Sequence, residues 1–230
     1  MARPVVLVHG AWHGPWCWDK VTPLLERAGV PWVAPDLPSA ASAATGGDLV
    51  ADVDAVESAL DGLDGDEPAV LVGHSRGGLV ITEAGAHPRA GHLVYLTALM
   101  LAEGEKTAEA IGPTTLYDHL DRADDGTFVP RPGPGANLFY NDCLGEDIAF
   151  AAANIRHQNM GGARVEPSRE AWKTKPTTYV VCTIDQAIGA AAQRRMAARA
   201  GATLEWDTGH SPFLSRPELV AALLVGLSRA

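Results

Sequence analysis

Three polar residues, far apart in the sequence, have the types that nucleophilic attack on a carbonyl carbon requires. Ser75 lies at the centre of GHSRGG (73–78), which contains the pattern G-x-S-x-G. A serine hydroxyl is a weak nucleophile near pH 7, so it needs a histidine as base and a carboxylate that orients this histidine. His210 lies in the turn DTGHSP, and Asp185 follows the apolar run TTYVVCTI. We therefore predict a catalytic triad of Ser75, His210 and Asp185.

Two other aspartates compete for the role of the acid. Asp207 is only three residues before His210, where it is expected to shape the turn. Asp36 precedes Ser75 in the sequence. In enzymes whose nucleophilic serine lies in a G-x-S-x-G turn between a strand and a helix, the acid lies between the serine and the histidine along the chain. Asp185 is the favoured acid for these reasons.

The segment around Ser75 has the pattern of a nucleophile elbow. The apolar run 69–72 predicts a strand and LVITEAGA (79–86) predicts a helix, so the chain must turn sharply between them. Glycines stand where side chains would clash, and the serine is forced into a strained, exposed conformation. A phosphate-binding loop is the other use of such glycines, but no G-K-[ST] follows here. His74, beside the serine, is expected to be structural.

A tetrahedral intermediate on Ser75 would need two N–H donors for its oxyanion. We predict the backbone N–H of Arg76, directly after the serine, and that of Ala11, in the loop after the first strand. His9 and His13 lie in or beside this loop, but they are not on a helix, so they do not predict a metal site. The residues predicted to shape the substrate pocket come from this loop and from a later insertion: Gly10, Trp12, Trp16, Leu138 and Phe139.

Strand and helix patterns alternate along most of the chain. Short apolar runs predict six strands, at 4–9, 32–37, 69–72, 92–100, 177–185 and 202–206. Helical patterns cover 19–28, 48–63, the segment after Ser75, 187–200 and 217–227, and residues 38–47 read as a loop. This alternation predicts an α/β fold: a doubly wound, mostly parallel six-stranded sheet with helices on both faces.

The alternation stops between residues 101 and 172. This stretch contains a run of prolines and glycines, the motif LFYND and one helical pattern over 146–155. An insertion after the C-terminal end of a strand would lie over the edge of the sheet where ligands bind in such folds. We therefore predict a core formed by residues 1–100 and 173–230, with residues 101–172 as a lid.

Composition limits the possible partners and the location. The net charge is −10, which argues against nucleic acid or an anionic membrane as partner. The three cysteines have no C-x-x-C spacing, and no stretch has the length of a membrane span or the pattern of a signal peptide. We expect a cytoplasmic protein whose partner is a small molecule. The sequence leaves the oligomeric state open, a homodimer included.

These motifs resemble the α/β-hydrolase fold family, and within it the small plant-type methylesterase and hydroxynitrile lyase group with its bacterial esterase relatives. The resemblance rests on LVHGAWHGPWCW, on GHSRGG, on TYVVCTIDQAI and on AGATLEWDTGHSPFLSRP. It implies the same triad and oxyanion donors, no cofactor, and ester hydrolysis through an acyl-enzyme. The lyases of the group carry a threonine and a lysine where this chain has Gly10 and Ser211, which argues against cyanohydrin cleavage.

The expected function is therefore the hydrolysis of small to medium hydrophobic carboxylic esters. Two alternatives stay open. One is a lyase or a cofactor-independent oxygenase or decarboxylase that uses the triad as a base. The other is a ligand-binding protein with slow residual hydrolysis.

Overall fold

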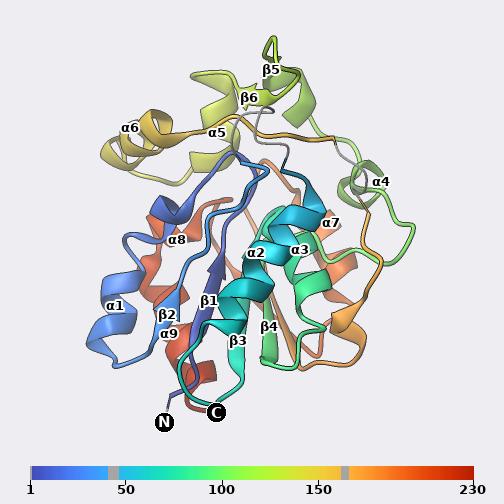
Figure 1. Cartoon of the computed structure of the whole chain (residues 1–230). Coiled ribbons are helices and arrows are strands. Elements are labelled where there is room, and N and C mark those ends of the chain that lie inside the picture. Colours follow the sequence, from blue (N-terminus) through green and yellow to red (C-terminus); the bar gives the residue numbers. More distant parts are fainter. Residues whose placement is uncertain (1, 41–46, 162–165) are drawn as a thin grey trace.

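Six parallel strands form one central sheet (Figure 1). The structure is a computed structural model that describes residues 2–40, 47–161 and 166–230. The order across the sheet is β2-β1-β3-β4-β7-β8, and every pair in it is parallel. The strands are β1 (Val5–Val8), β2 (Trp32–Val33), β3 (Ala69–His74), β4 (Ala90–Leu96), β7 (Thr177–Cys182) and β8 (Ala202–Trp206). The predicted fold class is confirmed.

Alternate side chains of the strands pack against two separate layers of helices. In β1, Val6 and Val8 join one apolar cluster while Val5 and Leu7 join the other. The first cluster includes residues of α2 (Leu49–Asp61), α3 (Gly77–Ala84) and α7 (Ala190–Ala197). The second includes residues of α1 (Thr22–Arg27), α8 (Pro212–Ser215), α9 (Pro217–Ser228) and the 3-10 helix η1 (Pro15–Trp18). Strands buried on both faces explain the continuous apolar runs in the sequence.

The first residue of helix α2 is set by a side-chain cap. The side chain of Asp48 accepts hydrogen bonds from the N–H groups of Val50 and Ala51, at 2.9 and 3.1 Å, and so caps the first turn. The predicted helix over 48–63 therefore begins one residue later than expected.

Four predicted strands are shorter in the structure, β1 by two residues and β7 by three, with β4 and β2 as follows. β4 ends at Leu96, not at residue 100, because Thr97 has φ of 41° and turns the chain out of the sheet. β2 has only two residues instead of six. The predicted loop over 38–47 includes residues 41–46, which lie outside the described residues.

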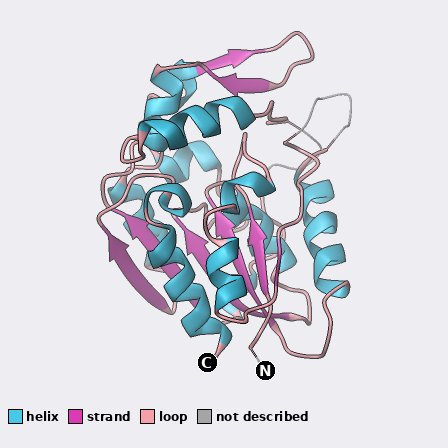
Figure 2. Ribbon diagram, turned by 90° about the vertical axis from the view of Figure 1, so that its left-hand side faces the viewer, coloured by secondary structure: helices cyan, strands magenta, loops and turns pink. Residues whose placement is uncertain are grey.

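Residues 101–161, called the cap from here on, lie over the carboxyl edge of the sheet (Figures 1 and 2). Residues 162–165 lie outside the described part, and the end of the predicted lid, residues 168–172, runs beside α3, where Ser168 and Arg169 bond to Glu83 and the 3-10 helix η4 (Ala171–Lys173) begins. The cap elements are α4 (Thr107–Ile111), η3 (Leu116–His119), β5 (Leu120–Arg122), β6 (Phe128–Pro130), α5 (Pro134–Tyr140) and α6 (Gly145–Asn154). β5 and β6 form an antiparallel hairpin, and apolar residues of η3, α5 and α6 join the second apolar cluster. The cap is thus folded onto the sheet layer and closes one end of it.

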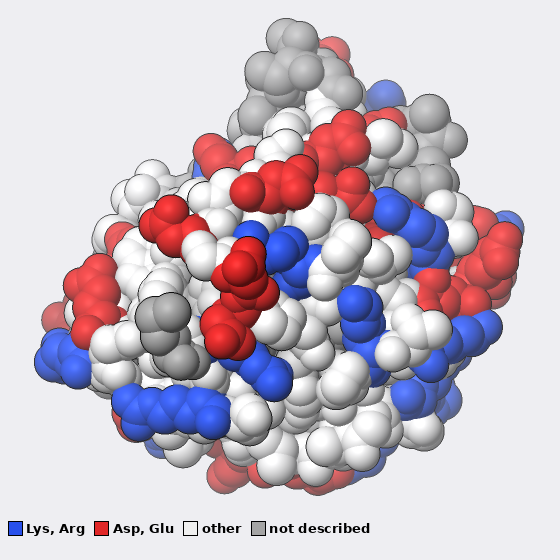
Figure 3. Space-filling model, turned by 60° about the horizontal axis from the view of Figure 1, so that its bottom comes forward, with Lys and Arg blue, Asp and Glu red and all other residues white. Residues whose placement is uncertain are grey.

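Charged side chains of both signs are interspersed on the face that lies away from the cap (Figure 3). Among the described residues of that face, Lys and Arg do not gather into a strip that would follow a phosphate backbone. None of the helices in the described ranges combines the length and the apolar character needed to cross a bilayer.

Candidate active site

Ser75 occupies a sharp turn between β3 and α3. Its φ is 51°, in the left-handed region that a residue with a Cβ rarely adopts. The turn is tight because a Cβ on Gly73 would lie 2.6 Å from the carbonyl oxygen of Gly77. The carbonyl of Ser75 accepts hydrogen bonds from Gly78 and Leu99, both at 3.0 Å, and these bonds fix the strained conformation. This is the geometry of a nucleophile elbow.

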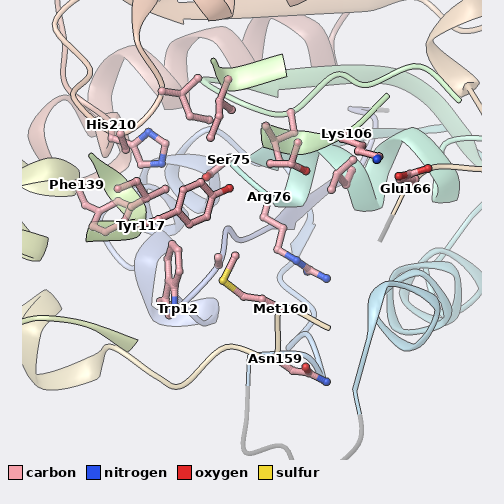
Figure 4. Close-up of a pocket in the computed structure, with 18 of the residues that line it drawn as sticks. Trp12, Ser75, Arg76, Lys106, Tyr117, Phe139, Asn159, Met160, Glu166 and His210 are labelled. Carbon is pink, nitrogen blue, oxygen red and sulfur yellow. The ribbon is translucent and has the colours of Figure 1, made fainter. Parts of the chain in front are cut away.

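His210 is paired with Asp185. Nδ1 of His210 lies 2.7 Å from Oδ2 of Asp185, and both side chains are almost completely buried. A carboxylate can only accept, so Nδ1 carries a proton and donates a hydrogen bond to Asp185. Nε2 of His210 then has a lone pair, and His210 and Ser75 line the same cavity. Figure 4 shows both side chains at this cavity, with His210 on one side of Ser75.

Asp185 is held by four further donors. The backbone N–H groups of Ala187 and Ile188 donate to Oδ1 at 2.7 and 3.0 Å. The amide of Gln193 donates to Oδ2 at 3.0 Å, and the hydroxyl of Thr97 donates to the same oxygen. These bonds fix the position and the orientation of the carboxylate.

Sequence reasoning missed Thr97 and Gln193. Thr97 was placed inside a predicted strand, although the strand ends one residue earlier and turns its hydroxyl toward Asp185. Gln193 lies in the expected helix after Asp185, and a polar residue on the buried face of that helix was the available signal.

Ala11 and Arg76 both line the cavity beside Ser75. In the described part of the chain, neither backbone N–H donates to a protein acceptor, so both are free to bind an oxyanion. The side chain of Arg76 forms an ion pair with buried Asp52 and leaves only its backbone to face Ser75. A Cβ on Gly10 would lie 2.9 Å from Cβ of Ser75, so the absence of a side chain lets this loop approach the elbow.

Backbone strain is concentrated at this site. Among the described residues, the non-glycine positions with positive φ are Trp12, Ser75 and Thr97, at 62°, 51° and 41°. Trp12 and Ser75 line the cavity, and Thr97 contacts Asp185. Strained conformations persist where the surrounding structure fixes them, and they gather at functional sites.

The cavity has a volume of about 390 Å³ and a largely apolar wall (Figure 4). Its described lining consists of Ala11, Trp12, Ser75, Arg76, Leu79, Leu99, Lys106, Thr107, Ile111, Leu116, Tyr117, Phe139, Asn159, Met160, Gly161, Glu166, Ala187, Ile188 and His210. Lys106 and Glu166 lie on the opposite side of Ser75 from His210 in Figure 4. The core and the cap both contribute walls.

The predicted pocket needs a correction. Trp12 and Phe139 line the cavity, but Gly10, Trp16 and Leu138 do not. The ring of Trp16 stacks on His13, with centroids 5.2 Å apart, because η1 turns it away from the cavity. Leu138 faces the second apolar cluster, and Gly10 lies behind Ser75 and His74.

His74 supports the ring of His210 from behind. Its Nε2 donates to the backbone carbonyl of His210 at 2.9 Å, and the two ring centroids are 4.8 Å apart. Burial lowers the pKa of His74 well below its ordinary value, so this imidazole is neutral. His74 is therefore a buried, neutral residue that packs against His210.

The other candidate residues lie elsewhere. Asp207 accepts a hydrogen bond from Thr183 at 3.3 Å, and Asp36 pairs with Arg156. His13 donates from Nδ1 to the carbonyl of Ala11. Among the described residues, no three His, Cys, Asp or Glu side chains gather so as to hold a metal ion.

Comparisons with known proteins give the family of the chain. Residues 5–223 match the model of the Alpha/beta hydrolase family. A pheophorbidase of Raphanus sativus is 29% identical over 246 residues, which cover 96% of this chain and 92% of that protein. The pFDCC methylesterase MES16 of Arabidopsis thaliana is 28% identical over 250 residues, which cover 97% and 95%. A solved pyrethroid hydrolase from Sphingobium faniae JZ-2 is similar at 26% identity and a TM-score of 0.84, with 100% of this chain and 98% of that chain covered. These matches confirm the predicted resemblance.

Proposed function

Since the chain belongs to the Alpha/beta hydrolase family, we propose that it is a carboxylic-ester hydrolase that works through an acyl-enzyme on Ser75. The observation that carries the proposal is the 2.7 Å hydrogen bond between Asp185 and His210, with His210 and Ser75 on the wall of one cavity. The names of two similar proteins, a methylesterase and a pyrethroid hydrolase, add support for a hydrolase and, in the first case, for an ester as substrate.

The proposed mechanism begins with proton transfer from Ser75 to Nε2 of His210 as the serine oxygen attacks the ester carbonyl. Asp185 holds the imidazole in the required tautomer and stabilises its positive charge. The N–H groups of Ala11 and Arg76 bind the oxyanion. His210 then returns the proton to the departing alcohol, and a water molecule hydrolyses the acyl-enzyme by the same steps in reverse.

The cavity favours a substrate of small to medium size with an apolar acyl or alcohol group. A volume of about 390 Å³ is that of an ordinary small-molecule site. Trp12, Tyr117 and Phe139 present aromatic surface to the bound molecule. Burial of such a group on these rings supplies binding energy that holds the carbonyl near Ser75.

Cyanohydrin cleavage has less support from the side chains beside His210. The residue that follows it is Ser211, which is buried and does not line the cavity. No cation therefore stands at that position to receive a departing cyanide.

The test compares the wild-type protein with Ser75→Ala on a panel of nitrophenyl esters of increasing acyl length. We expect hydrolysis by the wild type, loss of activity on the order of 10⁴-fold or more in the variant, and a fluorophosphonate adduct on Ser75 in mass spectrometry. Wild-type turnover by the variant would overturn the proposal. Tight ligand binding without turnover by the wild type would instead favour a binding protein.

A further inference from the structure

Among its polar contacts with the core, the cap has three that fall one residue from a group of the proposed active site, each in a different loop. The contacted residues are Trp12, Ile184 and Gly209. They are sequence neighbours of Ala11, Asp185 and His210 respectively.

Asp142, in the turn after α5, holds the loop of His210. Its Oδ2 accepts hydrogen bonds from the N–H of Gly209 and from the hydroxyl of Ser215, both at 2.8 Å. A Cβ on Gly209 would lie 2.5 Å from Oδ1 of Asp142 and 2.5 Å from Oδ1 of Asn141. Only a glycine lets the cap side chains come this close to the residue before His210.

Asn141 holds the loop of Asp185. Its side-chain amide donates to the carbonyl of Ile184 at 3.0 Å. The N–H of Ile184 in turn donates to the carbonyl of Thr208 at 3.2 Å, which ties the loop of the acid to the loop of the histidine. Two adjacent cap residues therefore fix both members of the Asp185 and His210 pair.

Trp12 is held by the cap at each of its polar atoms. Its N–H donates to Oε1 of Gln158 at 3.2 Å, and its carbonyl accepts from the N–H of Arg156 at 2.8 Å. Its indole N–H donates to the carbonyl of Phe128 at 3.0 Å. Gln158 is completely buried, and Trp12 has a positive φ that these bonds help to maintain.

We propose that Asn141, Asp142 and Gln158 are positioning residues, through which the cap sets the geometry of the acid, the base and the oxyanion donor as well as covering the cavity. This proposal rests on the proposed function. If the cap only covered the cavity, apolar contacts would be sufficient. Hydrogen bonds to the backbone next to Asp185, His210 and Ala11 would not be needed. A misplacement of about 1 Å at such a group costs on the order of 10²-fold in rate, so these contacts have catalytic consequences.

The experiment uses the full chain with Asp142→Ala, the conservative Asp142→Asn, and Asp121→Ala as a matched control. Asp121 is another cap aspartate with a polar partner, a 2.7 Å ion pair with Arg131, but it lies on the β5–β6 hairpin away from the three loops. For each variant, kcat and KM are measured across pH on one nitrophenyl ester. The active fraction is counted by fluorophosphonate titration.

For Asp142→Ala we expect kcat per active site to fall about 10- to 100-fold with little change in KM. Asp142→Asn should recover most of the loss, because its amide oxygen can take the place of Oδ2 and accept from both the Gly209 N–H and the Ser215 hydroxyl. Asp121→Ala should behave as the wild type. An unchanged kcat per active site in Asp142→Ala, or an equal loss in Asp121→Ala, would overturn the proposal.

Gln158→Leu gives an independent test of the oxyanion loop. We expect weaker inhibition by a trifluoromethyl ketone, whose adduct places an oxyanion near Ala11, while KM for the ester changes less. Equal changes in both would contradict a positioning role.

Failure of the proposed function would be visible in the wild type, as absence of both turnover and fluorophosphonate labelling. The positioning role would then be judged from the downfield proton resonance of the hydrogen bond between His210 and Asp185. We expect this signal to be shifted or lost in Asp142→Ala and unchanged in Asp121→Ala. An unchanged signal in Asp142→Ala would refute the role.

Discussion

The sheet and the cap meet at the same cavity, but they hold their residues in different ways. The sheet buries apolar side chains on both faces, and its reactive groups follow the ends of β3, β7 and β8. The cap contributes apolar wall, yet it is joined to the reactive loops by single polar side chains such as Asp142 and Gln158. In the proposed enzyme, the sheet would therefore carry the chemistry, whereas the cap would shape the cavity and align the catalytic groups.

The largest expected effect is on the sheet side, at the pair of Asp185 and His210. Asp185→Asn should lower kcat on the order of 10⁴-fold, because an amide can donate to Nδ1 and stabilise the wrong tautomer. Steady-state kinetics on a nitrophenyl ester measures this. Asp207→Asn is the control, since Asp207 contacts Thr183 and not the imidazole. An equal loss in both variants would mean that the acid is wrongly assigned.

The difference in stability between the two regions can be tested with two leucines. Leu71 is fully buried in β3, whereas Leu144 of the cap is 65% exposed. Leu71→Ala should lower the free energy of unfolding by about 2–5 kcal/mol, through lost burial and a cavity. Leu144→Ala should change it by less than about 0.5 kcal/mol. Urea titration followed by circular dichroism measures both, and similar losses would contradict this division.

The variant Gly10→Ala tests whether the close approach of the Ala11 loop to Ser75 is needed for turnover. The added Cβ would lie 2.8 Å from Nδ1 of His74 and 2.9 Å from Cβ of Ser75, so the loop that carries Ala11 must move. We expect a loss of about 10²-fold in kcat, the size associated with one displaced oxyanion donor. Gly226→Ala is the control, because a Cβ there has no neighbour within 4 Å. Normal turnover by Gly10→Ala would show that the close approach is not needed.

The smallest expected effect concerns His13, which connects the two regions. It donates to the carbonyl of Ala11 and accepts from the hydroxyl of Tyr140 on α5, at 2.7 and 2.9 Å. Burial lowers its pKa to about 3 from 6.5, so the unfolded chain binds more protons between these values. The free energy of unfolding should therefore fall as the pH falls below 6.5, by about 1.4 kcal/mol per pH unit from His13.

Urea titrations at several pH values between 4.5 and 7.5 measure this slope in the wild type and in His13→Gln. The variant should lose the part of the slope that belongs to His13. Buried His74, whose pKa is also lowered, contributes a slope of the same sign and remains in both proteins. Identical slopes would show that His13 is not the titrating group.

Local patterns in the sequence were sufficient for the six strands, their parallel arrangement and the turn at Ser75. Apolar runs and glycines act over a few residues, so they can be recognised without tertiary contacts. The ends of the strands were predicted less well. For example, β4 ends just before Thr97, and no local sequence pattern predicts the positive φ of Thr97. The pocket was predicted only in part: Trp12 and Phe139 line it, but Trp16 is turned onto His13.

By itself, the sequence determined the order of the elements and the types of reactive group, because burial periodicity and turn chemistry are properties of short segments. The sequence also favoured Asp185 as the partner of His210, but only the tertiary structure decided which side chains face the cavity and where the cap contacts the core. Those outcomes depend on contacts between residues as far apart as Trp12 and Gln158. A side chain's direction is set by its packing partners, and such distant partners are not identified by local sequence.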